Sequence, residues 1–175
     1  MFFAPYTQST EHRHFAQMLM EEAFPPEERP TFAHIDNRGS NYHLCVIEQN
    51  GTKLGIFAYW NFGTFLYIEH FAIGNKLRNN GIGSEALNHF LQNTGYNRQI
   101  VLEVEMPGNP LPTRRIEFYK RHGFVENAFQ YLQPPYRTGD GFLPMAIMSH
   151  QPLQKEDFEN VKQTLYTEVY GVLSV

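Results

Sequence analysis

The feature that most constrains the fold is a series of three strand-like segments between Tyr42 and Ile73: YHLCVIEQ, KLGIFAYW and FLYIEHFAI. The first alternates apolar and polar residues with a period of two, and turn residues separate all three, which predicts β-strands. Asn50–Gly51 and Gly63–Thr64 separate the segments, and the first pair is suited to a tight hairpin because both residues tolerate a positive φ. We therefore expect an antiparallel meander of three strands.

After Ile73 the apolar pattern takes the period of a helix, with Gly95 as a C-terminal stop. The apolar residues at this spacing are Ile82, Ala86, Leu87, Phe90 and Leu91. The segment QIVLEVEM then predicts another strand. A strand, a helix and a strand in succession imply a right-handed parallel crossover, so the sheet is expected to be mixed.

The flanking segments supply the remaining elements. We expect a short strand at the start, a helix over 10–23 with Phe15, Met18 and Leu19 on its apolar side, and a weaker helical piece over 27–35. A helix follows from about 110–113 to Gly123, then strands near 124–131 and 142–148, and a last helix over about 153–170. The predicted class is α+β, with a mixed, mostly antiparallel central sheet flanked by helices. At 175 residues the chain is expected to form a single domain over 1–175.

The charge and hydropathy of the chain exclude several classes of function. The net charge is −4 with no basic block, which argues against a nucleic-acid partner and weakly favours a cationic amine ligand. No segment approaches eighteen uninterrupted apolar residues, and the first residues lack a signal-peptide pattern. We therefore expect a cytoplasmic protein without a membrane span.

Neither cysteine nor histidine predicts a reactive or metal centre. Cys45 is the single cysteine and lies in an alternating segment, so we interpret it as a small core residue. The eight histidines are scattered and lack the spacing of zinc ligands. No metal site is predicted.

The segment KLRNNGIGSEAL, residues 76–87, has the composition of a phosphate-binding loop, with two interpretations. GIGSEA fits the dinucleotide fingerprint G-x-G-x-x-G/A, with Glu103 about where that fold places its ribose-binding acid. That fingerprint requires its first glycine to follow a buried parallel strand directly. Here GNKLRNN separates Ile73 from Gly81. A nicotinamide or flavin enzyme is therefore disfavoured.

The whole span from YIEHFAI to the following helix resembles the acetyl-CoA-binding motif of the GCN5-related N-acetyltransferase (GNAT) superfamily, Arg/Gln-x-x-Gly-x-Gly/Ala. Arg78, Gly81 and Gly83 stand at its three defining positions. A second segment, FYKRHGF from Phe118 to Phe124, is similar to the later helix and strand start of the same family. The resemblance covers about 42–148 and implies the GNAT fold, with the parallel crossover at the cofactor site.

Two positions depart from the family pattern. An asparagine often lies seven residues before the tyrosine of the later helix and an alanine three or four before it, and here those places hold Pro112 and Arg115 or Ile116. Asn109 is near but offset, so we assign it no cofactor contact. The resemblance implies main-chain binding of the pantetheine arm at the end of the preceding strand and binding of the diphosphate by the glycine loop. The cofactor residues so implied are Phe71, Ala72, Ile73, Arg78, Asn79, Asn80, Gly81, Ile82, Gly83 and Ser84.

The resemblance also implies a proton donor for the departing thiolate, a role commonly taken by the tyrosine of the later helix, here Tyr119. For the base we predict Glu69, a charged residue inside an aromatic strand, with Glu103 and Glu105 as competing carboxylates and His70 as the next candidate. Strict alternation places Glu69 on one face with Tyr67 and Phe71. His70 then lies on the opposite face with Ile68 and Ala72.

The function implied is transfer of an acetyl group from acetyl-CoA directly to a primary amine of a small molecule or peptide, without a metal. The alternative is a non-catalytic acyl-CoA-binding or interaction domain with the same fold. The loop QPPYRTGDG, which carries Tyr136, is either a flap over the acceptor or a hairpin turn. The identity of the acceptor and the choice between monomer and homodimer stay open.

Overall fold

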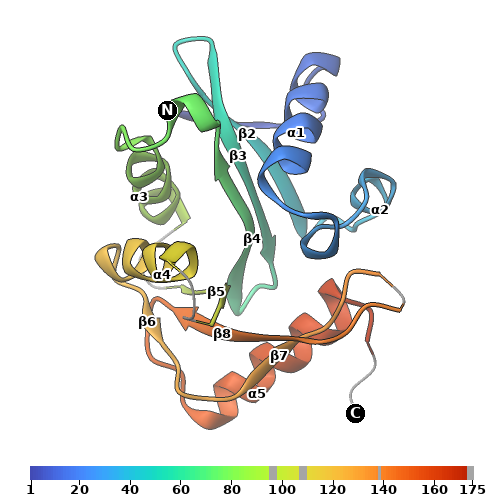
Figure 1. The fold of residues 1–175 in the computed structure, drawn as a ribbon, viewed down its shortest axis with the longest axis vertical. Helices are drawn as coiled ribbons and strands as arrows, with labels where there is room; N and C mark the ends of the chain where they lie inside the picture. The colour runs from blue at the N-terminus through green and yellow to red at the C-terminus, as the bar shows by residue number, and fades with distance from the viewer. Residues whose placement is uncertain (95–97, 107–109, 138, 173–175) are drawn as a thin grey trace. The chain divides into compact units, whose positions relative to one another are not determined.

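The computed structural model describes residues 1–94, 98–106, 110–137 and 139–172 (Figure 1). It divides into two compact units, Met1–Arg98 and Gln99–Val175. The single domain expected from chain length stays a prediction. Gly95, the expected helix stop, and Asn109 lie outside the described residues.

In the first unit the predicted meander is confirmed. Its described strands pair antiparallel in the order β1 (Phe2–Pro5), β2 (Tyr42–Gln49), β3 (Thr52–Asn61) and β4 (Phe65–Ile73). The β2–β3 hairpin turns on Asn50 and Gly51, whose φ angles are 51° and 75°. These values are those of a two-residue hairpin turn, as the sequence predicts. Gly63, with φ 80°, turns the chain from β3 into β4.

A β-bulge interrupts β4 at Glu69. Ala58 of β3 pairs with His70, but the next residue, Tyr59, pairs with Ile68, so Glu69 is the extra residue. A bulge lets two successive side chains share a face, which strict alternation forbids. The expected alternation in this strand is therefore wrong: Glu69 and His70 lie on the same face, and Tyr67 and Phe71 on opposite faces, because the bulge shifts the register between them.

Helices cover both faces of this sheet, with α1 (Thr10–Ala23) and α3 (Ile82–Thr94) on opposite sides of β2–β4 (Figure 1). Ser9 caps α1, since its Oγ accepts the His12 amide at 3.2 Å. Leu19 is buried as predicted, but Met18 is 53% exposed. The expected apolar side was one position off, because Ala16, Leu19 and Met20 form the buried stripe of α1. On the other face, Phe90 of α3 packs 4.5 Å from Phe57 of β3, measured between ring centroids.

The connection from α1 to β2 contains η1 (Pro26–Glu28) and α2 (Phe32–Asp36) instead of the continuous helical piece expected over 27–35. Arg29, between them, is extended with φ −142° and ψ 147°. The residue before a proline avoids the helical region, and Pro30 follows directly. The proline therefore splits the predicted helix in two.

In the second unit, β8 (Leu143–Ser149) pairs antiparallel with β5 (Gln99–Glu105), β6 (Val125–Glu126) and β7 (Tyr131–Gln133). The single strand expected over 124–131 is wrong. Buried Asn127 breaks it, because its side chain donates to the Ile147 carbonyl at 3.0 Å and to Ser149 Oγ at 2.8 Å. These bonds replace the regular ladder and let the chain leave β8.

The described helices of this unit are α4 (Pro110–Arg121), α5 (Lys155–Thr164) and the π-helical η3 (Leu165–Val169). Gly123, with φ 85°, ends α4 as predicted, and the Phe124 amide bonds back to the Tyr119 carbonyl at 3.1 Å. The expected last helix is α5 continued by η3. Its predicted apolar face is buried and consists of Phe158, Val161, Leu165 and Val169. Among the described residues, no helix is both long and apolar enough to cross a bilayer.

Candidate active site

The loop between β4 and α3 has the backbone geometry of an anion site. β4 ends at Ile73, the short η2 (Asn75–Leu77) follows, and α3 starts at Ile82. Asn79 and Gly81 take positive φ angles of 66° and 79°, which turn the chain abruptly into the helix. A Cβ built on Gly81 meets no atom within 4 Å, so open space adjoins the backbone here.

The first turn of α3 carries amide groups without a partner inside the helix. The Glu85 amide bonds to the Gly81 carbonyl at 3.0 Å, which is the first helical bond. The amides of Ile82, Gly83 and Ser84 precede it and have no intrahelical acceptor. Together with the positive end of the helix dipole they form a site suited to a phosphate.

Arg78 shapes the loop as well as adding charge to it. Its Nε donates to the carbonyl of Ile73 at 2.8 Å and so ties the loop to the end of β4. The residue is exposed overall, which leaves its terminal guanidinium nitrogens within reach of an anion. Asn79 and Asn80 are also exposed. The local sequence thus brings the predicted loop residues together around one helix terminus.

The end of β4 supplies the residues predicted to bind the pantetheine arm through their main chain. Ala72 and Ile73 are each 8% exposed, and Phe71 is half-buried against Phe57. Glu69 is half-buried as a residue although its side chain is 0% exposed. Its remaining exposure therefore belongs to the main chain at the bulge, where ladder bonding is disrupted.

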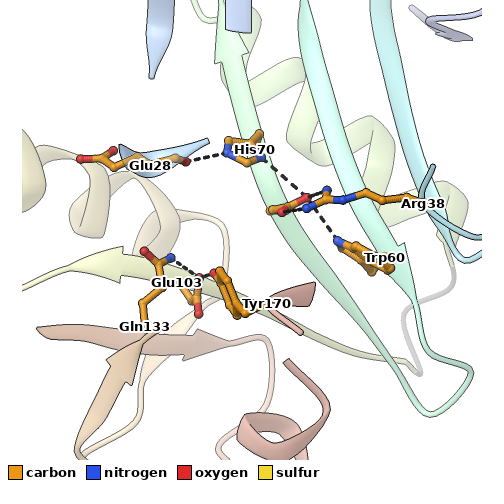
Figure 2. Close-up of polar contacts among 8 residues, drawn as sticks. Glu28, Arg38, Trp60, His70, Glu103, Gln133 and Tyr170 are labelled. Atoms are coloured by element: carbon orange, nitrogen blue, oxygen red, sulfur yellow. Dashed lines mark hydrogen bonds and ion pairs between the residues drawn. The ribbon is translucent and has the colours of Figure 1, made fainter. Parts of the chain in front are cut away.

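The Glu69 carboxylate lies in a buried ion pair. Arg38 donates to it through both terminal nitrogens, at 2.6 and 2.9 Å, and the Trp60 indole donates at 3.2 Å. The Arg38 side chain is 3% exposed, and its guanidinium lies 4.4 Å from the Tyr42 ring and 4.9 Å from the Trp60 ring. Figure 2 shows Arg38 and Trp60 converging on this carboxylate beside His70.

Two opposing effects set the pKa of Glu69. Burial alone raises it, but the charge of Arg38 and the hydrogen bonds that Arg38 donates outweigh burial and hold the pKa well below its ordinary value. A carboxylate stabilised in this way is a weak proton acceptor. The environment of Glu69 is therefore that of a permanent anion rather than of a base.

His70, the next candidate for the base, has both ring nitrogens next to oxygens. Its Nε2 donates to the main-chain carbonyl of Glu28 at 3.0 Å (Figure 2), and its Nδ1 lies 3.7 Å from the Glu69 carboxylate. The ring also packs edge-on against Phe24, with 4.7 Å between centroids. At 2% exposure this imidazole is built into the protein interior.

In the second unit, Tyr119 lies on the buried side of α4, 7% exposed, beside Phe118 and Phe124. Burial raises the pKa of Tyr119 to about 12. A phenol is protonated at neutral pH at its ordinary pKa as well, so this shift is compatible with a proton donor but does not identify one.

The Glu103 carboxylate of β5 accepts three hydrogen bonds within the second unit. The Tyr131 hydroxyl bonds to one oxygen. Gln133 at 2.5 Å and Tyr170 at 2.6 Å donate to the other (Figure 2). Tyr170 is the C-cap residue that directly follows the π-helical η3. Glu103 is thus held as an ion by several donors.

Glu105, two residues further along β5, is in a different environment. It contacts Arg115 of α4 at 3.4 Å, and the two side chains are 38% and 43% exposed. Exposed pairs of this kind contribute little to stability. Glu105 is therefore the most solvated of the three predicted carboxylates.

The partners of these carboxylates were missed by sequence reasoning. Arg38 follows α2 in a segment without periodicity, and Tyr170 lies at the far end of the chain from Glu103. Spacing of residues along the chain carries no signal for such contacts. The only available hint was a charged residue inside an apolar strand, which implies that a partner exists but not which residue it is.

Comparison with known proteins places the chain in a family. The model of the acetyltransferase (GNAT) family matches residues 10–124. A solved structure from Bacteroides thetaiotaomicron, described as a GNAT-family acetyltransferase, is 42% identical with a TM-score of 0.90, covering 98% of this chain and 99% of that one. A search of curated proteins returned no match.

More distant structures share the fold. The ribosomal-protein-S18-alanine N-acetyltransferase from Escherichia coli is 19% identical with a TM-score of 0.62, covering 89% of this chain and 97% of that one. An aminoglycoside 6'-N-acetyltransferase complexed with coenzyme A is 13% identical with a TM-score of 0.59, covering 89% of this chain and 100% of that one.

The family match extends over more than half of the 175 residues, and the Bacteroides structure extends over nearly all of them. The predicted fold class is confirmed: the chain has the α+β GNAT fold, with a mixed, mostly antiparallel sheet flanked by helices. The chain belongs to the GNAT acetyltransferase family.

Proposed function

We propose that the protein is an N-acetyltransferase that moves the acetyl group of acetyl-CoA directly to a primary amine of a small molecule or peptide. The observation that carries this proposal is the loop 78–84, whose positive-φ residues lead into the N-terminus of α3. Membership of the GNAT family supports it, as does a structural neighbour complexed with coenzyme A.

The residues of the first unit fit the donor substrate. The amides of Ile82, Gly83 and Ser84 are suited to the diphosphate, and Arg78 adds positive charge beside them. Gly81 leaves open space where a side chain would otherwise stand. The main chain of 71–73 would hold the amide-rich pantetheine arm much as an added strand is held.

In the proposed reaction the amine nitrogen attacks the thioester carbon, a C–N bond forms and the C–S bond breaks. The Tyr119 hydroxyl gives its proton to the departing thiolate, and the proton lost from the nitrogen returns to the phenolate through solvent. The pKa of about 12 keeps Tyr119 protonated before each turnover. The base role predicted for Glu69 stays a hypothesis, and the ion pair with Arg38 weighs against it.

The acceptor is proposed to be cationic before it loses its proton, since the chain carries a net charge of −4. A cytoplasmic location, where acetyl-CoA is available, stays a prediction, and the choice between monomer and homodimer stays open. Cell fractionation tests the first and light scattering of the purified protein tests the second.

The function is tested by mixing the purified protein with acetyl-CoA and a panel of primary amines and following release of the free thiol. Turnover with at least one amine and its loss in Tyr119→Phe are expected. Tight binding of coenzyme A with no turnover on any amine would instead identify a non-catalytic acyl-CoA-binding domain. Failure to bind any acyl-CoA would refute both.

A further inference from the structure

The bulge in β4 gives two consecutive side chains, Glu69 and His70, the same orientation. Both contact residues of the connection between α1 and β2, and Figure 1 shows α2 of this connection on the same side of β2–β4 as α1. In a regular strand one of the two would point to the opposite face. The bulge therefore allows two consecutive residues of β4 to bind two sites along this connection, Arg38 and the turn at Glu28.

The first point is Arg38, which directly follows the C-cap of α2. Its planar guanidinium pairs through two nitrogens with Glu69 and lies close to the rings of Tyr42 and Trp60. Such a fork fixes direction as well as distance, which a lysine ammonium does not. With side-chain exposures of 3% and 0%, this pair is shielded from solvent and from salt.

The second point is the short turn after α1. His70 donates to the main-chain carbonyl of Glu28 in η1 and packs against the ring of Phe24. Arg29 closes the same turn by donating from Nε to the Phe24 carbonyl at 3.1 Å. The segment 24–38 contains η1 and α2. Near its two ends it forms hydrogen bonds with two adjacent residues of β4, His70 and Glu69.

The contacts between segment 24–38 and β4 lie next to the proposed binding site of acetyl-CoA. The diphosphate is proposed to lie at 78–84, beyond the C-terminal end of β4, and the pantetheine arm along 71–73. The thiol end of the pantetheine arm then points toward Glu69 and His70. The acceptor amine has to reach that end, so it approaches next to segment 24–38. An acceptor wall at this place has to be rigid, because reacting groups tolerate little misplacement.

We infer that Glu69 and His70 are positioning residues that hold segment 24–38 as a wall of the acceptor site, with Arg38 as the partner through which Glu69 acts. The inference rests on the proposed function. It predicts that loss of the Arg38–Glu69 pair weakens use of the amine and leaves binding of acetyl-CoA unchanged. It also predicts that Glu69 is not the base of the reaction.

The test compares Arg38→Met, Glu69→Gln and the double variant by steady-state kinetics. Each single change is expected to lower kcat/KM for the amine by about 10- to 100-fold, the range in which misplacement of a substrate falls. The double variant is expected to match the single ones, since residues that act as a pair are not additive. Lys53→Met, which removes an ion pair to Glu11 outside this segment, is the matched control and should leave the kinetics unchanged.

The pH dependence separates positioning from base catalysis. If Glu69 is a positioning residue, Glu69→Gln keeps the shape of the wild-type pH profile of kcat, and Arg38→Met behaves in the same way. If Glu69 is the base, Glu69→Gln abolishes the pH-dependent limb while Arg38→Met retains it. That result, or additive effects in the double variant, would overturn the inference.

Hydrogen exchange provides a readout that does not depend on turnover. Arg38→Lys keeps the charge but loses the fork, so amides in 24–38 are expected to exchange faster than in the wild type while those of 78–94 stay unchanged. Unchanged exchange in 24–38 would contradict the inference even in a protein that acetylates amines. Faster exchange together with no turnover of the wild type would instead place the failure in the proposed function.

Discussion

Gly81→Ala offers a quantitative test of the cofactor loop, because the strain it introduces can be separated from steric overlap. Gly81 has a φ of 79°, and a Cβ at this position meets no atom within 4 Å. The alanine therefore fits the space, but its backbone must adopt a conformation that L-residues avoid. That strain costs about 1–2 kcal/mol.

The strain energy of Gly81→Ala lowers either the thermal stability of the protein or its affinity for coenzyme A. If the loop keeps its shape, the protein loses 1–2 kcal/mol of stability, at about 2–4 °C in Tm for each kcal/mol. If the exposed loop relaxes into another shape, stability changes little and binding must restore the strained conformation. The same free energy then lowers the affinity for coenzyme A by about 5- to 30-fold, since 1.4 kcal/mol is a factor of ten.

Gly63→Ala is the matched control for this prediction. Gly63 has a φ of 80°, also has no atom within 4 Å of a built Cβ, and lies in the β3–β4 turn rather than in the loop. We expect calorimetry of coenzyme A binding to show weaker affinity for Gly81→Ala and wild-type affinity for Gly63→Ala. Equal affinities in the two variants, with Gly81→Ala no less stable than the wild type, would refute the proposed role of the loop.

Four further outcomes are expected. Tyr119→Phe should bind coenzyme A normally and reduce kcat by about 10²- to 10⁴-fold, as expected for loss of a general acid, in thiol-release assays. Gly55→Ala places a Cβ 2.4 Å from the Ala72 carbonyl oxygen, so urea unfolding should show a loss of about 1–3 kcal/mol, with weaker coenzyme A binding because β4 must shift. Because the pKa of Glu69 is lowered in the folded state, its stabilisation is present above the ordinary carboxyl pKa and lost as pH falls through the folded value. Glu69→Gln should therefore cost about 3–5 kcal/mol near pH 7, and the difference from wild type should narrow in acid denaturation. Burial raises the pKa of the Cys45 thiol to about 11, so thiol reagents should modify the native protein slowly at pH 8 and rapidly after unfolding.

The elements that depend on neighbouring residues could be predicted from the sequence. Asn50 and Gly51 determine the β2–β3 hairpin because few residues tolerate their positive φ, and Gly123 ends α4 for the same reason. The loop 78–84 belongs to this class too, since its shape follows from a strand end, a glycine and a helix start that are close in the chain. Its role in binding coenzyme A stays a prediction.

Features that depend on distant partners could not be predicted. Periodicity assumes a regular strand, and the bulge at Glu69 arises from the pairing of β4 with β3, which the sequence of β4 alone does not encode. The strand expected over 124–131 failed similarly, because Asn127 finds its partners on β8 only after the chain has folded. Arg38 reaches Glu69 across 31 positions, and no local pattern marks that contact.

The three carboxylates predicted as candidate bases differ in how many neighbouring groups depend on their charge. Protonating Glu69 would leave the buried Arg38 charge without its counterion, and protonating Glu103 would disrupt bonds from three donors. Both changes carry a large free-energy cost, because desolvated charges and donors need their acceptors. Glu105, in contrast, contacts Arg115 at 3.4 Å in an exposed pair of the kind that contributes little to stability. Glu69 and Glu103 are therefore suited by their surroundings to remain anions that hold neighbouring side chains in place.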